Sequence, residues 1–285
     1  MPQICILTAA PDYFEDLSSA RANYQRLLGD DIAFRHWTDP GVLAGYDLVL
    51  PLLVWGYQRN CARWFALLDR LEQQRIKIAN PVSVLRWNSD KSYLLELEKA
   101  GVAVVPTLIT EALTAKDIAE AAQTFGSDEL VIKPPISGGA DGTFRLQKDQ
   151  PLPEEIAGKT MLIQPFQPAI EQEGEYSLFY FSGAYSHAII KRPATGDFRV
   201  QEFLGGSESG TDCPPGAQGL AVQARQAAEQ ILGTGTLFYA RVDMLRDPDG
   251  YFRLMELELI EPSLFFEHAA DEGASFRQAV LTRLA

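Results

Sequence analysis

Three carboxylates and an arginine alternate along two neighbouring segments near the end of the chain, "LFYARVDML" and "YFRLMELEL". In an extended strand, residues two apart share a face, so Arg241 and Asp243 point the same way, as do Glu256 and Glu258. The intervening "RDPDG" is a strong turn signal, so the two segments are predicted to form a hairpin. Carboxylates on one face of paired strands make a hard-oxygen site suited to Mg²⁺, which also binds substrate phosphates.

The register of this hairpin decides whether the carboxylates converge. A two-residue loop at 248–249 would set Asp243 opposite Leu254 and keep all the carboxylates on one face. A glycine bulge at Gly250 would slip the pairing by one residue, and the sequence leaves both registers open. A solvated polar face is a further interpretation, because that is what alternating glutamates in a strand usually indicate.

A second candidate for chemistry is "VIKPPISGGADG", residues 131–142. Lys133 precedes the glycines, whereas a Walker phosphate loop has its lysine after them, and G-x-G-x-x-G is absent. Because "GTFRL" follows, the segment predicts a strand, a glycine loop and a second strand. Backbone N–H groups in such a loop can cradle an anion, to which a nearby lysine adds charge. An ordinary flexible hairpin is the alternative.

The composition limits the classes of protein to consider. The chain has 285 residues, of which 46% are hydrophobic, enough for a large core and two or three subdomains. Its net charge of −13 argues against nucleic acid or an anionic membrane as partner. The three cysteines lack a C-x-x-C pair, which is typical of a reducing cytoplasm and excludes a cysteine-rich zinc module. "MPQICILTAA" has no basic leader region, and "LVLPLLVW" is too short to span a bilayer, so we expect a cytoplasmic protein.

The elements that must position these groups fall into three stretches. The first eighty residues alternate apolar runs with amphipathic helices, around Tyr13 to Leu28 and Arg59 to Gln73, which predicts a parallel sheet with crossover helices. Two short helices are expected within "NPVSVLRWNSDKSYLLELEKAG". A compact unit from about 106 to 161 has a helix at 115–125 and the strands beside the glycine loop. Strands then predominate, with a helix near 217–232.

Taken together and in this order, several segments resemble the ATP-grasp superfamily, and the resemblance covers nearly the whole chain. They are "RWNSDKSYLLELEKAGVAVVPT", "VIKPPISGGADGTFRL", "MLIQPF", "FYARVDML" and "MELELIEPSLFF". The chain looks most like the branch that contains glutathione synthetase-like enzymes and the O-ureido-serine cyclo-ligase of cycloserine biosynthesis. The set of motifs is specific, although each one alone is weak.

The resemblance implies a mixed α/β (α+β) ATP-grasp fold with a parallel N-terminal α/β domain, a central α+β lid and a mainly antiparallel C-terminal sheet domain. We expect these at residues 1–84, 85–163 and 164–285. The implied activity is an ATP-dependent carboxylate–amine ligase: the acid attacks the γ-phosphate, and an amine captures the acyl phosphate. No catalytic base is evident, and phosphoryl transfer depends mainly on positioning and charge neutralisation.

The expected partners are a small amino-acid-like or peptide-like carboxylate and an amine, with no nucleic acid and no membrane, and self-association is left open. The expected cofactors are ATP and Mg²⁺, with Mn²⁺ as a substitute. Ring closure within one molecule uses the same chemistry and is an alternative. A nucleotide-binding regulator that keeps the fold without turnover is the rival from another class.

The resemblance also gives roles to individual residues. Phosphate contacts fall to Lys91, Lys133 and the loop of Ser137, Gly138 and Gly139. Main-chain groups of Gln164 and Phe166 would read adenine, Glu175 the ribose, and Lys191 and Arg199 the phosphates or the substrate carboxylate. Asp243, Glu256 and Glu258 would hold magnesium, and Arg241 would bind the substrate or the transferred phosphate.

Some positions depart from the family or have weaker support. Family members commonly have Asn where this chain has Glu258, and the extra negative charge requires a compensating cation or a different number of metal ions. Trp55, Tyr57 and Arg59 are candidates for an acid-binding surface. The three histidines, His36, His187 and His268, show no ligand spacing and are interpreted as structural.

Overall fold

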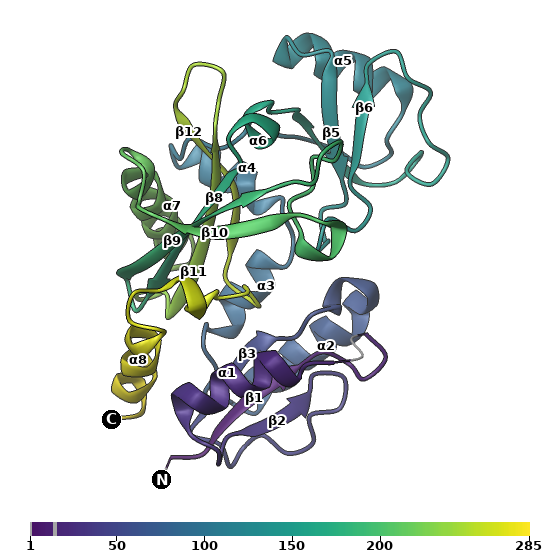
Figure 1. Cartoon of the computed structure of the whole chain (residues 1–285). Coiled ribbons are helices and arrows are strands. Elements are labelled where there is room, and N and C mark those ends of the chain that lie inside the picture. Colours follow the sequence, from purple (N-terminus) through teal and green to yellow (C-terminus); the bar gives the residue numbers. More distant parts are fainter. Residues whose placement is uncertain (1, 14–15) are drawn as a thin grey trace.

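A parallel sheet forms the first part of the fold, which we describe from a computed structural model that covers residues 2–13 and 16–285 (Figure 1). β1 (Ile4–Thr8) lies between β2 (Ala33–His36) and β3 (Leu48–Leu53), and both pairings are parallel, as predicted. The crossover helices are α1 (Ser18–Leu28) and α2 (Cys61–Gln73). The first helix begins later than the expected Tyr13, and Phe14 and Glu15 of that prediction lie outside the described residues.

The second sheet is antiparallel and carries the glycine loop between two of its strands. Its order is β4-β7-β5-β6, made of β4 (Leu108–Thr110), β5 (Glu129–Lys133), β6 (Phe144–Gln147) and β7 (Met161–Pro165). α5 (Ala115–Phe125) covers it through Ile118 and Ala121. The Thr114–Asp117 capping box begins α5 and Gly126 in a left-handed conformation ends it, which explains why its bounds match the prediction.

The third sheet has five antiparallel strands in the order β10-β9-β8-β11-β12. These are β8 (Glu175–Phe181), β9 (Ala184–Arg192), β10 (Ser207–Thr211), β11 (Tyr239–Arg246) and β12 (Phe252–Glu258). The remaining helices are α3 (Val82–Asn88), α4 (Tyr93–Lys99), α6 (Ala169–Gln172), α7 (Ala217–Leu232) and α8 (Ala274–Leu284), with three short 3₁₀ turns, η1 (Tyr57–Asn60), η2 (Glu202–Leu204) and η3 (Phe266–His268). In the described part of the chain, none of the helices is long and apolar enough to cross a bilayer.

The two faces of the five-stranded sheet have different neighbours. On one face, Leu178 and Val242 pack against α4 and α7 in a continuous apolar core. On the other, Phe179 and Phe181 pack toward α8 and the N-terminal sheet. Because side chains alternate along a strand, Glu175 shares this second face and continues it beyond the aromatic residues. The division at 84 and 163 stays a prediction.

The register of the β11–β12 hairpin differs from the two-residue loop. Gly250 adopts a φ of +84°, and the pairing starts one residue out of step, so Met244 lies opposite Leu254. A second irregularity follows at Met255 and sets Asp243 opposite Glu256. Two successive one-residue shifts restore the original face. The partners that the two-residue loop predicts are therefore wrong. The one-residue slip at Gly250 and the shared face of the carboxylates are confirmed.

Candidate active site

A cavity of about 490 Å³ lies where the glycine-loop sheet meets the second face of the five-stranded sheet. It is also bordered by the loop after β3, with Trp55, Gly56 and Tyr57. The structure brings together all fourteen residues that the sequence assigned to nucleotide, substrate or metal, because the cavity wall includes Lys91, Lys133, Ser137, Gly138, Gly139, Gln164, Phe166, Glu175, Lys191, Arg199, Arg241, Asp243, Glu256 and Glu258.

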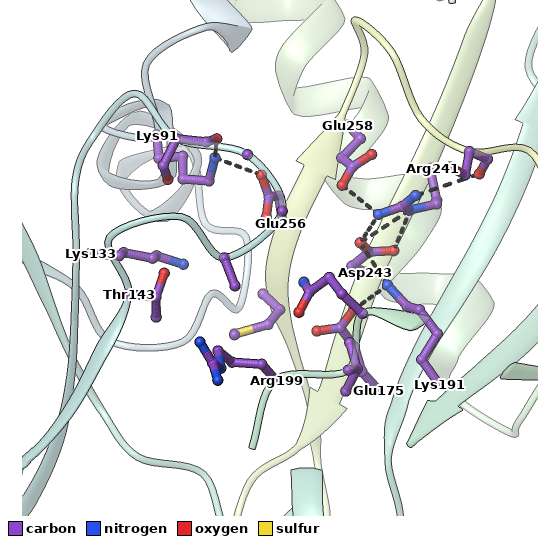
Figure 2. A pocket seen from close by; sticks show the side chains of 18 of the residues that line it. Lys91, Lys133, Thr143, Glu175, Lys191, Arg199, Arg241, Asp243, Glu256 and Glu258 are labelled. Carbon is purple, nitrogen blue, oxygen red and sulfur yellow. Dashed lines mark hydrogen bonds and ion pairs between the residues drawn. The ribbon is translucent and has the colours of Figure 1, made fainter. Parts of the chain in front are cut away.

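Ion pairs join most of the charged side chains along the sheet face. Figure 2 shows the Arg241 guanidinium between Glu258 and Asp243, with its Nη2 2.8 Å from Asp243 Oδ2. Lys191 bridges Asp243, at 3.3 Å, and Glu175. Ser177 donates a further hydrogen bond of 2.6 Å to Asp243. Asp243 is thus the centre of a buried network.

The electrostatics of this network follow from burial and from these partners. Burial acts to raise the pKa of Asp243, but Arg241 and Lys191 outweigh it and hold that pKa at about 2. Burial raises the pKa of Glu258 to about 7, and Asp243 adds to this shift while Arg241 opposes it. For Glu175, burial raises the pKa despite the Lys191 ammonium. The face therefore concentrates negative charge that only cations can stabilise.

The three presumed metal-binding carboxylates share one face, but each is paired with a cation. Among the described residues, no group of three or more His, Cys, Asp or Glu side chains is already gathered around a point that could hold a metal ion. Their oxygens are nevertheless the hard donors that Mg²⁺ requires, so the donor set of Asp243, Glu256 and Glu258 fits the ion. Lys91 and Arg241 lie where an ion would compete with them for those oxygens.

The two lysines of the lid side have different surroundings. Lys91 Nζ lies 2.9 Å from Glu256 Oε1 and donates a hydrogen bond to the Ser137 carbonyl. Lys133 has no ion pair among the described residues, and it points into the cavity beside Thr143 (Figure 2). Burial lowers the pKa of Lys133 to about 8, with Glu256 opposing and Lys91 adding to the shift. Lys133 thus lacks a counter-ion that a phosphate could supply.

The glycine loop makes contacts on both sides of the cavity. Gly139 has a φ of +61°, and a Cβ there would lie 3.4 Å from the ring of the exposed Phe203 in η2. A Cβ on Gly138 would come within 3.4 Å of the Gln58 side chain. Glycine at 139 is therefore favoured by backbone conformation, whereas the contact with Phe203 would be an ordinary one.

We expect Gly139→Val to weaken the use of ATP by about tenfold, or about 1.4 kcal/mol, because a Cβ hinders the approach of the loop backbone to the phosphates. The matched control is Gly41→Val, since Gly41 has a φ of +64° and no atom within 4 Å of its Cβ position. Both variants should lose similar stability in thermal melting. An unchanged dependence of ADP release on ATP in Gly139→Val would reduce the loop to a flexible turn.

The adenine prediction requires a correction. The Phe166 N–H donates to the Glu129 carbonyl at 2.9 Å and is used inside the β5–β7 pairing. Main-chain groups alternate in direction along a strand, so Pro165 C=O and the Gln167 N–H point away from β5. Within the described residues the Gln167 N–H has no hydrogen-bond partner, and both residues line the cavity. The side-chain oxygens of Gln164 and Gln167 are also buried without partners.

Arg199 is fixed by an aspartate that the sequence did not single out. Asp197 accepts from Arg199 Nη2 at 2.7 Å and from Nε at 3.0 Å. Asp197 Oδ1 also accepts the main-chain N–H groups of Phe198 and Arg199. The hydrogen bonds from Arg199 hold the pKa of Asp197 well below its usual range. Asp197 is a positioning residue for Arg199.

Asp197→Asn should raise the KM for ATP or for the acid about three- to tenfold while changing kcat less. Asparagine keeps an oxygen for the two main-chain donors but loses the charge that orients Arg199. Steady-state kinetics beside thermal melting would measure this. We expect Asp197→Glu to restore part of the KM, and a KM that is unaltered in Asp197→Asn would refute the positioning role.

Only two of the three residues predicted to form an acid-binding surface lie at the cavity. Trp55 and Tyr57 line the cavity, whereas Arg59 is absent from its wall. The Arg59 guanidinium lies 4.7 Å from the centre of the Tyr13 ring, and its Nε is 3.4 Å from Asp141 in the glycine loop. Sequence reasoning also missed Glu261, which lines the cavity beyond β12. Burial, together with Glu258, raises the pKa of Glu261 to about 8.

The three histidines have partners within the fold. His36 Nδ1 lies 2.7 Å from the Ala9 carbonyl oxygen, and His187 Nε2 lies 3.1 Å from that of Leu264. His268 stacks on Phe265. Burial lowers the pKa of His187 to about 4, so it is neutral at pH 7. These contacts agree with structural roles.

The arrangement of the parallel sheet, the glycine-loop sheet and the five-stranded sheet is that of an ATP-grasp protein. A crystal structure of D-cycloserine synthetase DcsG matches this chain with a TM-score of 0.85 and 24% identity, covering 99% of each chain. The chain has the ATP-grasp fold and resembles members of that superfamily. Its structural neighbours include enzymes of the ATP-grasp ligase class.

Comparison of sequences places the chain near two branches of that superfamily. Residues 4–80 match the family described as D-cycloserine synthetase DcsG, N-terminal domain. The cycloserine biosynthesis protein DcsG of Streptomyces lavendulae is 29% identical over 271 residues, which cover 87% of both chains. A glutathione synthetase of Prochlorococcus marinus is 25% identical over 226 residues, which cover 76% of this chain and 68% of the synthetase. The predicted resemblance is confirmed.

Proposed function

We propose that the chain is a carboxylate–amine ligase that consumes ATP, forms an acyl phosphate and acts on a small amino-acid-like or peptide-like substrate. The observation that carries the proposal is the meeting of two sets of groups across one cavity. Lys91, Lys133 and the glycine loop face it from one side, and the carboxylate face of β11 and β12 borders the other. Phosphates and a divalent cation are the ligands that this pairing suits.

The nucleotide would lie along the cavity with its base at the β7 end. Pro165 C=O and the Gln167 N–H present one acceptor and one donor, as the edge of adenine requires, and so replace the Phe166 N–H of the original prediction. Glu175 stays the candidate for the ribose. Lys133 and Lys91 would then meet the phosphates, with the main chain of Gly138 and Gly139 closing over them.

Asp243, Glu256 and Glu258 would hold Mg²⁺, which when bound neutralises phosphate charge and orients the transferred group. The extra charge of Glu258, where relatives of the family commonly have asparagine, has a compensating cation here. Arg241 pairs with Glu258 and also with Asp243. When substrates bind, the Arg241 guanidinium is placed to donate hydrogen bonds to the transferred phosphoryl group as well as to these carboxylates.

In the proposed reaction, a carboxylate oxygen of the substrate attacks the γ-phosphorus, and the bond to the bridging oxygen of ADP breaks. The amine nitrogen then attacks the acyl carbon, loses a proton as the C–N bond forms, and releases phosphate. Lys133, Lys91 and Arg241 stabilise the negative charge of the phosphoryl group during both steps, and the closed loop excludes water from the acyl phosphate.

A screen of ADP release tests the proposal without knowledge of the amine. Purified protein with ATP and Mg²⁺ is supplied with amino acids and small dipeptides, and hydroxylamine serves as a surrogate nucleophile. We expect acid-dependent ADP release together with a hydroxamate of matching mass. Absence of both with every acid, from protein that binds ATP, would favour a regulator without turnover.

Ring closure within one molecule is a second form of the same proposal. The similarity to a protein named for cycloserine biosynthesis, over 87% of each chain, favours it. Product mass distinguishes the two forms. The product of ligation has the mass of two substrates less one water, whereas the product of ring closure derives from a single substrate and has a lower mass than that substrate.

A further inference from the structure

Three carboxylates of the cavity wall form no ion pair with any described residue, and Glu261 is the one beside the β11–β12 face. The buried acids of the β11–β12 face pair with Lys91, Lys191 or Arg241. Within the described residues, the Glu261 carboxylate forms no ion pair and no hydrogen bond to another residue, although it lines the same cavity. Glu202 and Glu208 also line it without an ion pair, but they lie on η2 and on the edge strand β10.

The position of Glu261 is fixed by its neighbours from two sheets. The Trp55 Nε1–H donates to the Glu261 carbonyl at 3.1 Å, and the Tyr239 hydroxyl donates to the preceding carbonyl, of Ile260, at 2.6 Å. Four residues further on, Phe265 adopts a φ of +43°, a strained conformation for an aromatic residue. Glu261 therefore stands at the junction of the N-terminal sheet and the five-stranded sheet.

The surroundings of Glu261 suit a positively charged group. Trp55, Tyr57 and Phe265 line the same cavity, and Trp55 contacts the Glu261 main chain. Aromatic rings attract cations through their electron-rich faces. A carboxylate partly removed from water needs a compensating charge. Lys91 acts on Glu261 through space, but it is already paired with Glu256. Lys133 needs a negative charge instead, because its buried ammonium forms no ion pair with any described residue.

We propose that Glu261 binds an ammonium group of the substrate and makes the enzyme selective for amino-acid-like molecules in which that group is free. The phosphates of a bound nucleotide would pair with the Lys133 ammonium. The ammonium group of an amino acid bound beside it would pair with the Glu261 carboxylate. This inference rests on the proposed function and deepens it, since it assigns the residue that distinguishes an amino acid from the same acid without its amino group.

The first test measures binding and does not require turnover. Protein saturated with Mg²⁺ and a non-hydrolysable ATP analogue is titrated with D- and L-alanine and D- and L-serine, each beside its desamino counterpart, propionate or 3-hydroxypropionate. Thermal stabilisation gives the Kd. We expect at least one amino acid to bind wild-type protein about tenfold more tightly than its counterpart. Glu261→Gln should reduce that preference to less than about twofold.

Two further variants serve as controls. Glu261→Asp keeps the charge and should retain part of the preference. Glu267→Gln makes the same chemical change at an exposed glutamate outside the cavity wall and should keep all of it. A wild type without any preference, or a full preference in Glu261→Gln, would overturn the inference.

ADP release with hydroxylamine then separates this inference from the proposed function. A binding preference that depends on Glu261, without any ADP release, would leave the inference standing and count against the ligase. ADP release that is equally fast with an amino acid and with its desamino counterpart would support the ligase and refute the role of Glu261. A fall in kcat/KM of Glu261→Gln that is equal for both substrates would also refute it.

Discussion

Glu256→Gln is expected to lower turnover about a hundredfold or more, equivalent to about 2.7 kcal/mol of transition-state stabilisation. Glu256 contributes one of the three carboxylates that fit Mg²⁺, and it also pairs with Lys91 at 2.9 Å. Glutamine keeps the size of the side chain but loses the charge. Acid-dependent ADP release at saturating ATP measures the effect.

The same substitution should also reduce stability, because it leaves the buried Lys91 without its partner. We expect a loss of about 1–3 kcal/mol in the free energy of unfolding. The double variant Lys91→Met with Glu256→Gln removes both charges and should recover much of that stability while staying inactive. Wild-type turnover in Glu256→Gln would reject the metal role of this face.

Lys133→Met is the second variant with a large expected effect. It should lower activity while raising the free energy of unfolding. We expect kcat/KM for ATP to fall roughly ten- to hundredfold, since one charge-assisted contact with phosphate is lost. At pH 7 the variant should be more stable than wild type by about 1–3 kcal/mol, because a buried ammonium without an ion pair is replaced by an apolar side chain. Lys159→Met, at an exposed lysine, is the matched control.

The stability gain of Lys133→Met should depend on pH in a defined direction. The pKa of Lys133 is about 8 in the folded protein and lies near its ordinary 10.5 in the unfolded chain. Between these values the unfolded chain holds more protons, so wild-type stability rises with pH in this window relative to the variant. Denaturant unfolding at pH 7 and pH 10 would test this, and a constant difference would contradict it.

Helices and strands could be predicted because their signals are local. α7 spans Ala217–Leu232, as predicted, and ends at Gly233 in a left-handed conformation. The hairpin register could not be predicted, because the bulge at Met255 has no local sequence signature. Only the alternation of Glu256 and Glu258 and the slip at Gly250 were visible beforehand.

The composition of the site was easier to predict than its contacts. Motif order placed Lys91 and Glu256 in one cavity, but their ion pair joins residues far apart in the sequence and depends on how two sheets meet. The Phe166 N–H was misassigned because its direction depends on the register of β7 against β5. Glu261 was missed because a glutamate before a proline has no chemical signature until the cavity forms around it.

The most direct test of the proposed ligase mechanism follows the oxygen that joins the acyl carbon to phosphorus in the acyl phosphate. The substrate that supports ADP release is labelled with ¹⁸O in its carboxylate, and the released phosphate is analysed by mass spectrometry. If an acyl phosphate forms, one labelled oxygen passes from the carboxylate to the released phosphate in every turnover. Unlabelled phosphate, with the second carboxylate oxygen lost to water when the product forms, would contradict the ligase mechanism.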